Sequence, residues 1–179
     1  MQKPKRLEDL FVDNGFDDYQ WIQGKDIKVA QWVRFKCMYG CNSYGKSSTC
    51  PPNVPTVNEC ERFFSEYSSA IIFHFNVKFE DSEQLKPWCK TINNKLAKLE
   101  RDVFLAGFYK TFVLYVDECN ICSTCTAERS ECKNKKIARP CTEALAIDIY
   151  ETVRNIGYPI QVLTDSKEEM NRYAILLIE

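Results

Sequence analysis

A cysteine-rich motif with C-x2-C-x2-C spacing stands in the second half of the 179-residue chain. It consists of Cys119, Cys122 and Cys125, with Cys132 further on. Such short spacings let several thiolates converge on one soft metal centre, and iron–sulfur clusters are held by loops of this kind. A zinc site with cysteine ligands is the alternative, although structural zinc sites more often use separated C-x2-C pairs. The spacing therefore favours a 4Fe–4S cluster over zinc.

A second group of thiols lies upstream and consists of Cys37, Cys41 and Cys50. Pro51 follows the last of them, as proline follows the final cysteine of a bacterial ferredoxin run. Three thiolates leave either an open iron or a fourth ligand from elsewhere in the chain. The cysteine candidates for that ligand are Cys60, Cys132 and Cys141, and a non-cysteine ligand or a bound small molecule also stays open. The clustered thiols exceed the four that one cube uses, so we expect one or two clusters, with two favoured.

The remaining cysteines and the single histidine have less specific roles. Cys60 and Cys89 fall on predicted helices and are expected to be small buried hydrophobic residues. Cys141 stands at the start of a predicted helix, where a thiolate is favoured, so a buried thiol and a metal ligand both stay open. His74 lies within a hydrophobic strand and is expected to be structural. No phosphate-binding glycine loop or Ser-His-Asp set identifies catalytic residues.

The composition is that of an ordinary globular protein, with 45% hydrophobic residues. A net charge of −1 leaves no electrostatic footprint for nucleic acid or an anionic membrane, so we expect neither as a partner. No apolar run approaches the ~18 residues of a spanning helix, and residues 1–6 lead into acidic residues rather than a signal peptide. The sequence therefore predicts a cytoplasmic protein, in which ten cysteines indicate metal binding rather than disulfides.

Hydrophobic periodicity predicts helices at residues 7–14, 58–67, 82–106 and 142–155. Runs of β-branched and aromatic residues predict strands at residues 70–77, 111–116, 160–163 and 173–178. Residues 27–35 fit either a strand or a helix, and residues 37–55 read as an irregular loop. This order predicts one α/β or α+β domain over residues 1–179. We expect a mixed-sheet sandwich covered by two long helices, with both cysteine loops meeting at one end.

The motifs together resemble the family of predicted metal-binding proteins called domain of unknown function 2284. Residues 37–52 resemble its first signature, residues 99–110 the stretch before its second signature, and residues 119–148 that second signature. The resemblance implies a mainly prokaryotic metal-binding protein whose family name assigns no activity. It carries over seven thiols: Cys37, Cys41, Cys50, Cys119, Cys122, Cys125 and Cys132. The family often has a proline soon after the cysteine that matches Cys132, and a small residue where Cys141 stands.

The leading interpretation is a small 4Fe–4S protein that passes single electrons to a redox partner protein. Hydrogen bonds to sulfur from Asn42, Asn120 and Thr124 are expected to tune its potential. A second interpretation is an enzyme, or enzyme subunit, whose open iron binds a substrate. A third is an interaction module that zinc stabilises, with no chemistry of its own.

Overall fold

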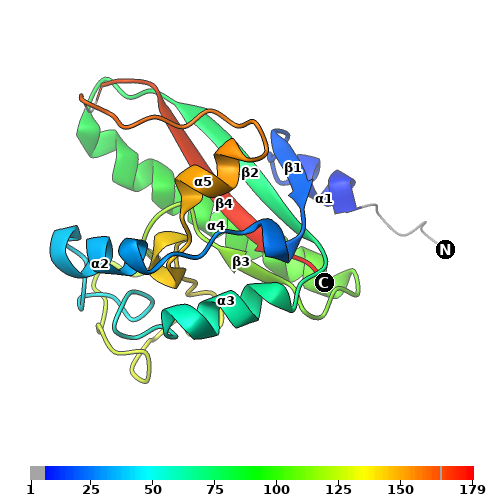
Figure 1. Cartoon of the computed structure of the whole chain (residues 1–179), viewed down its shortest axis with the longest axis horizontal. Coiled ribbons are helices and arrows are strands. Elements are labelled where there is room, and N and C mark those ends of the chain that lie inside the picture. Colours follow the sequence, from blue (N-terminus) through cyan, green and yellow to red (C-terminus); the bar gives the residue numbers. More distant parts are fainter. Residues whose placement is uncertain (1–6, 166) are drawn as a thin grey trace.

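The computed structural model describes residues 7–165 and 167–179, and its centre is a four-stranded antiparallel sheet (Figure 1). The strands follow the order β1-β2-β4-β3 across the sheet. Their bounds are Tyr19–Ile22 for β1, Ala70–Val77 for β2, Phe112–Leu114 for β3 and Met170–Leu177 for β4. Residues 1–6, on which the argument against a signal peptide depends, lie outside the described residues.

The central strands β2 and β4 form the longest pairing of the sheet. Each contributes eight residues, and Ala70 lies opposite Leu177 at one end of the ladder. Alternate side chains point to opposite faces. Ile71 and Phe73 are buried on one face and Ile72 on the other. Because both faces are covered, β2 reads in the sequence as a continuous apolar run rather than an alternating one.

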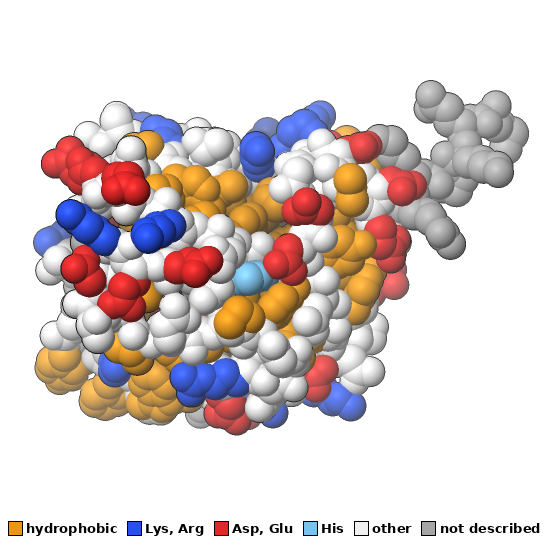
Figure 2. All heavy atoms as spheres, turned by 90° about the horizontal axis from the view of Figure 1, so that it is seen from above, with side chains coloured by type: hydrophobic (Ala, Val, Ile, Leu, Met, Phe, Trp, Pro, Cys, Tyr) orange, Lys and Arg blue, Asp and Glu red, His pale blue; other side chains and the backbone are white. Residues whose placement is uncertain are grey.

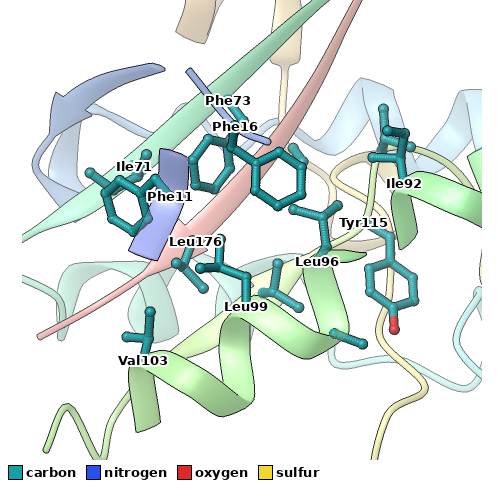
Figure 3. Packing of buried hydrophobic residues seen from close by; sticks show 14 of the residues in the cluster. Phe11, Phe16, Ile71, Phe73, Ile92, Leu96, Leu99, Val103, Tyr115 and Leu176 are labelled. Atoms are coloured by element: carbon teal, nitrogen blue, oxygen red, sulfur yellow. The ribbon is translucent and has the colours of Figure 1, made fainter. Parts of the chain in front are cut away.

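One face of the sheet is covered by α1 (Leu7–Asp13) and by the long helix α4 (Leu85–Leu105). Figure 3 shows Leu96 of α4 directed towards the aromatic side chains that lie on the sheet. Phe11 and Phe73 meet edge to face, with their ring centroids 5.4 Å apart. This arrangement of aromatic rings adds to the stabilisation that comes from burial alone.

The opposite face is covered by shorter elements. They are the 3-10 helix η1 (Gly24–Asp26), α3 (Val57–Ser65), the 3-10 helix η3 (Glu143–Leu145) and α5 (Ile149–Arg154). A capping box starts α3, because Thr56 accepts a hydrogen bond from the Glu59 backbone while the Glu59 carboxylate accepts one from the Thr56 backbone. Helix α2 (Gln31–Gly40) contacts η3 and extends to one side of the sheet (Figure 1). The 3-10 helix η2 (Ser82–Gln84) leads into α4.

The predicted class, an α/β or α+β fold, is confirmed. The strands expected at residues 70–77, 111–116 and 173–178 correspond to β2, β3 and β4, although β3 is shorter. The helices expected at residues 7–14, 58–67 and 82–106 correspond to α1, α3 and α4. The segment that fits a strand or a helix is mostly helix α2, preceded by a single bridge from Val29 to Ile147.

The expectation of a mixed sheet is wrong, because the strands pair only in antiparallel fashion among the described residues. Strands β2 and β3, which α4 connects, run in the same direction but do not pair. Strand β4 inserts between them and runs antiparallel to both. A parallel contact exists only as the isolated bridge from Tyr115 to Cys141, within the described part of the chain.

The predicted strand at residues 160–163 is also wrong, since this segment is irregular. Gln161 makes loop contacts instead. Its backbone carbonyl accepts a hydrogen bond from the Tyr150 hydroxyl, and its side-chain amide donates one to the Glu169 carbonyl. The strand at the edge opposite β3 is β1, which the sequence did not reveal because it has four residues and only Ile22 among them is buried.

The predicted helix at residues 142–155 is wrong as a single helix. Ala146 has φ 60°, in the left-handed region, and separates η3 from α5. Tertiary hydrogen bonds explain the break, because the backbone N–H of Ala30 donates to the Ala146 carbonyl and that of Asp148 donates to the Lys28 carbonyl. Of the two long helices expected, only α4 is present among the described residues.

No helix among the described residues has the length and apolar character needed to cross a membrane. On the face that Figure 2 shows, acidic and basic side chains are interspersed, with hydrophobic side chains between them. This distribution agrees with the small net charge of the chain.

We expect Leu96→Ala to lower the free energy of unfolding by about 2–5 kcal/mol, because the side chain is fully buried between α4 and the sheet. Leu105→Ala is the matched control, since Leu105 ends the same helix with 66% of its surface exposed. This variant should lower the free energy of unfolding by less than about 0.5 kcal/mol. Denaturant unfolding at equal metal content measures both, and equal losses would contradict this account of the core.

Candidate metal centre

The four cysteines of the downstream motif line one small cavity of about 20 Å³. Cys132 is buried, Cys119 and Cys122 are partly buried, and Cys125 is exposed. No carboxylate or imidazole is found among the described residues that line this cavity. A donor set made of thiols alone suits a soft metal such as iron in a cluster, or zinc.

Two hydrogen-bond donors point at sulfur atoms of this motif. The backbone N–H of Ser48 donates to Cys125 Sγ across 3.4 Å. The side-chain amide of Asn134 donates to Cys122 Sγ across 3.0 Å. Donors of this kind stabilise the charged form of sulfur and tune metal–thiolate sites. Neither Ser48 nor Asn134 was anticipated from the sequence, because neither residue type is distinctive in a polar loop.

The thiols of the downstream motif differ in how their environments affect ionisation. Burial raises the pKa of Cys119, although the backbone N–H groups of Ile121 and Arg139 oppose it. Burial also acts against ionisation of Cys125, but hydrogen bonds led by the backbone N–H of Ser48 outweigh it and lower the pKa. The exposed thiol of Cys125 therefore ionises readily. The partly buried thiol of Cys119 needs a nearby positive charge, such as a metal ion, in order to ionise.

The three upstream cysteines line a larger, open cavity of about 1500 Å³. Cys37 lies in the last turn of α2, Cys41 caps the end of this helix, and Cys50 lies in the following loop. The backbone N–H of Cys41 donates to the Cys37 carbonyl across 3.3 Å. The helix end therefore fixes the spacing of the first two thiols. Cys141 and Glu143 line the same cavity from a distant part of the chain.

Burial raises the pKa of two of the upstream thiols, those of Cys37 and Cys50. It raises the pKa of Cys37, where the nearby Cys41 acts in the same direction and Arg34 opposes. It raises the pKa of Cys50 to about 12, and a hydrogen bond with Ser47 opposes it. Without a bound cation, both thiols are therefore protonated near neutral pH.

Arg34 ties helix α2 to the segments around the upstream group. Its guanidinium donates to the carbonyl of Pro55 across 3.1 Å and to that of Ala144 across 3.0 Å. One turn further along α2, the Cys37 thiol lies 3.7 Å from the carbonyl oxygen of Glu143. The end of α2 is thus held against the η3 segment, which brings Cys37 next to the residues that follow Cys141.

The two cysteine loops meet at one end of the molecule, as predicted. The Asn53 side-chain amide donates to the Ala127 carbonyl across 2.7 Å, and Ser48 of the upstream loop contacts the Cys125 sulfur. In Figure 1 the loop after α2 and the loop after β3 lie together below α2. Residues of one loop therefore contribute to the surroundings of the other loop's thiols.

A buried asparagine of α4 holds the start of the downstream loop. The Asn93 carboxamide accepts from the backbone N–H of Val116 and donates to the Glu118 carbonyl and to Asn120 Oδ1, each within 3.3 Å. Asn120 is therefore engaged with α4, and its own side-chain amide donates to the Lys86 carbonyl of this helix across 3.5 Å rather than to a cysteine sulfur, contrary to the expectation. Of the other two residues expected to do so, Asn42 lines the upstream cavity and Thr124 the downstream one.

A buried ion pair holds the other end of this loop. Arg139 pairs with Glu100 of α4 across 2.8 Å, and both side chains are largely buried. Glu100 also accepts from the backbone N–H of Val113 in β3 across 2.9 Å. Burial raises the pKa of Glu100, while Arg139 opposes that effect. The sequence carried a signal of this role, because Glu100 interrupts the apolar face of a strongly periodic helix.

The other cysteines and the histidine lie apart from the downstream motif. Cys60 belongs to the core on the α3 face of the sheet, and its thiol is 3.7 Å from the Pro55 carbonyl. Cys89 lies in the core on the α4 face. The ring nitrogens of His74 lie 2.6 Å from Asp18 and 2.8 Å from Asn171. His74 therefore uses both nitrogens in structural contacts, as expected.

Within residues 7–165 and 167–179, no three Cys, His, Asp or Glu side chains lie close enough to hold a single metal ion. A tetrahedral ion with thiolates at ~2.3 Å would set their sulfurs about 3.8 Å apart. Thiolates of a cluster are bound to separate irons and stand further apart. What the described residues present is two cavities that are each lined by four cysteines.

Comparison with known protein families gives one family for almost the whole chain. The family model described as "Predicted metal-binding protein (DUF2284)" matches residues 20–178, which include both groups of cysteines. Neither the curated proteins nor the solved structures contain a match to the chain.

We expect Glu100→Gln to lower the free energy of unfolding by about 3–5 kcal/mol, because it leaves the buried Arg139 charge without its partner. Asp102→Asn is the matched control on the same helix. Asp102 pairs with the exposed Lys98, and its loss should be at most about 1 kcal/mol. Denaturant unfolding measures both. Similar losses would mean that the buried pair does not anchor the loop.

Proposed function

The chain belongs to the family of predicted metal-binding proteins, DUF2284, and we propose that it binds iron in 4Fe–4S clusters. The observation that carries this proposal is the pair of donors aimed at cysteine sulfurs in the downstream motif, from Ser48 and Asn134. Hydrogen bonds to thiolate sulfur are a means by which proteins tune such clusters. The ligands proposed for this site are Cys119, Cys122, Cys125 and Cys132.

The downstream cavity must widen to hold a cluster. Its volume of about 20 Å³ has room for roughly one water molecule. Residues 126–136, which form its outer side, are largely exposed and contain no helix or strand. This segment can therefore move outward without breaking secondary structure, while Asn93 and Arg139 keep the two ends of the loop in place.

The small volume also favours a second candidate for this group, a single zinc ion held by the same thiolates. The protein would then be an interaction module that zinc stabilises. This alternative needs the four sulfurs to converge on one ion, whereas a cluster needs them to stand further apart around a wider cavity. Metal analysis separates the two.

We propose electron transfer as the function of the iron–sulfur protein, with a redox partner protein in the cytoplasm. A bound 4Fe–4S cluster supplies a reversible one-electron couple. The role of the protein is to hold the cluster near the protein surface. Cys41 and Cys125 are the exposed members of the two groups of cysteines. A partner can therefore approach either group directly.

Contact between the two loops supports transfer between two clusters. Ser48, whose backbone N–H donates to the Cys125 sulfur, precedes the upstream ligand Cys50 by two residues. Electron transfer falls steeply with distance, so two sites separated by one short segment can exchange electrons. We therefore propose that Cys37, Cys41 and Cys50 hold a second cluster.

The open cavity beside the upstream group favours an enzymatic alternative. Its volume of about 1500 Å³ exceeds that of typical small-molecule sites. In this alternative Cys37, Cys41 and Cys50 would hold three irons of a cluster, and the fourth iron, without a protein thiolate, would be open to a substrate. Whether a fourth thiolate is available decides between this alternative and electron transfer.

We expect anaerobically purified protein to contain about eight irons and about eight acid-labile sulfides per chain, as two 4Fe–4S clusters require. Metal analysis and a sulfide assay measure both. Stoichiometric zinc without sulfide would contradict iron–sulfur binding, and about four irons in fully loaded protein would contradict the second cluster.

We expect Cys122→Ser to lose the downstream cluster, because this thiol belongs to the motif and accepts the Asn134 hydrogen bond. The matched control is Cys89→Ser, a buried cysteine of α4 outside both groups. The variant Cys122→Ser should retain about half of the wild-type iron, and Cys89→Ser nearly all of it. Equal iron loss in the two soluble variants would show that our assignment of ligands is wrong.

A further inference from the structure

We propose that Cys141 is the fourth thiolate of the upstream group, so that both clusters are held by four cysteines. This inference rests on the proposed iron–sulfur function. It concerns a residue that the short motif spacings do not include. Cys141 lines the same open cavity as Cys37, Cys41 and Cys50.

The backbone of the sheet edge holds Cys141 in place. Tyr115, immediately after β3, forms a parallel bridge with Cys141, and its backbone N–H donates to the Pro140 carbonyl across 2.9 Å. The Tyr115 side chain is fully buried, and its hydroxyl donates to the Ile137 carbonyl. Cys141 therefore stands on a fixed segment, as a ligand must if three others come from a helix end and a loop.

Contacts from α2 bring the upstream group to this segment. The Cys37 thiol lies 3.7 Å from the Glu143 carbonyl oxygen, and Arg34 donates to the Ala144 carbonyl across 3.0 Å. The segment that follows Cys141 is therefore held against the end of α2, which carries Cys37.

The other two candidates for the fourth ligand lie elsewhere. Cys132 lines the downstream cavity with the three cysteines of its own motif. Cys60 lies in the core between α3 and the sheet, is 1% exposed, and lines a separate cavity beside Phe63 and Phe112. Of the three candidates, Cys141 alone shares a cavity with the upstream thiols.

The consequence is that eight of the ten cysteines form two sets of four ligands, one set for each cluster. The upstream set is Cys37, Cys41, Cys50 and Cys141, and the downstream set is Cys119, Cys122, Cys125 and Cys132. Each iron is then bound by a protein thiolate, and none is open to a substrate. The large cavity gives access to the cluster as a whole, which suits electron exchange.

The test compares Cys141→Ala with Cys60→Ala in anaerobically prepared full-length protein. Iron and sulfide per chain are measured, with the electron-resonance spectrum of the reduced protein. We expect Cys60→Ala to match the wild type. Cys141→Ala should lose about half of the iron and the magnetic coupling between clusters. Wild-type iron and coupling in Cys141→Ala, or their loss in Cys60→Ala alone, would overturn the inference.

A second measurement uses the wild-type protein and does not depend on a variant that folds. Cyanide binds an open iron of a cluster, but a cluster held by four thiolates offers it no site. We expect cyanide to leave the electron-resonance spectrum of the reduced protein unchanged, and a shifted spectrum would overturn the inference. Wild-type protein without iron and sulfide would instead contradict the proposed function itself, so the two failures are distinguishable.

Discussion

One carboxylate of helix α4, that of Glu100, joins three parts of the molecule. It accepts a hydrogen bond from β3 and pairs with Arg139 at the end of the cysteine loop. An irregular loop has no hydrogen-bonded ladder of its own, so its position depends on such contacts with the core. The backbone N–H of Arg139 also opposes the burial that raises the pKa of Cys119, so the residue that forms the ion pair acts on a proposed ligand. Because both charges are largely buried, neither can lose its partner without a large loss of stability.

The same burial that stabilises the fold acts against the ionisation of several thiols. The pKa of Cys50 is raised to about 12, and burial raises those of Cys37 and Cys119 as well. A bound metal reverses this effect, because it supplies positive charge beside the sulfur and displaces its proton. Metal binding is therefore coupled to the stability of the loops, and proton release accompanies it. The pKa of Cys125 is lowered already, so this exposed thiol ionises more readily than an ordinary cysteine.

The sequence predicted those parts of the fold that local patterns determine. Helix α4 follows from the helical spacing of its apolar residues, and β2 from a continuous apolar run that both covered faces require. The break at Ala146 was not predictable, because it depends on hydrogen bonds from residues 28–30, which are distant in sequence. The insertion of β4 between β2 and β3 likewise depends on pairing between segments that are distant in sequence. A pattern within one segment contains no information about which other segment pairs with it.

The candidate site divides in the same way. Closely spaced cysteines identify ligands that one loop supplies, and the downstream thiols do line one cavity. The groups that position these thiols come from elsewhere: Asn93 from α4, and Ser48 from the other loop. Cys141 is a further case, because the bridge to Tyr115 and the contacts of α2 with η3 place it beside the upstream cavity. A cysteine on a distant segment is positioned by the sheet edge that fixes this segment, so the number of thiols around the upstream cavity follows from the fold rather than from the motif.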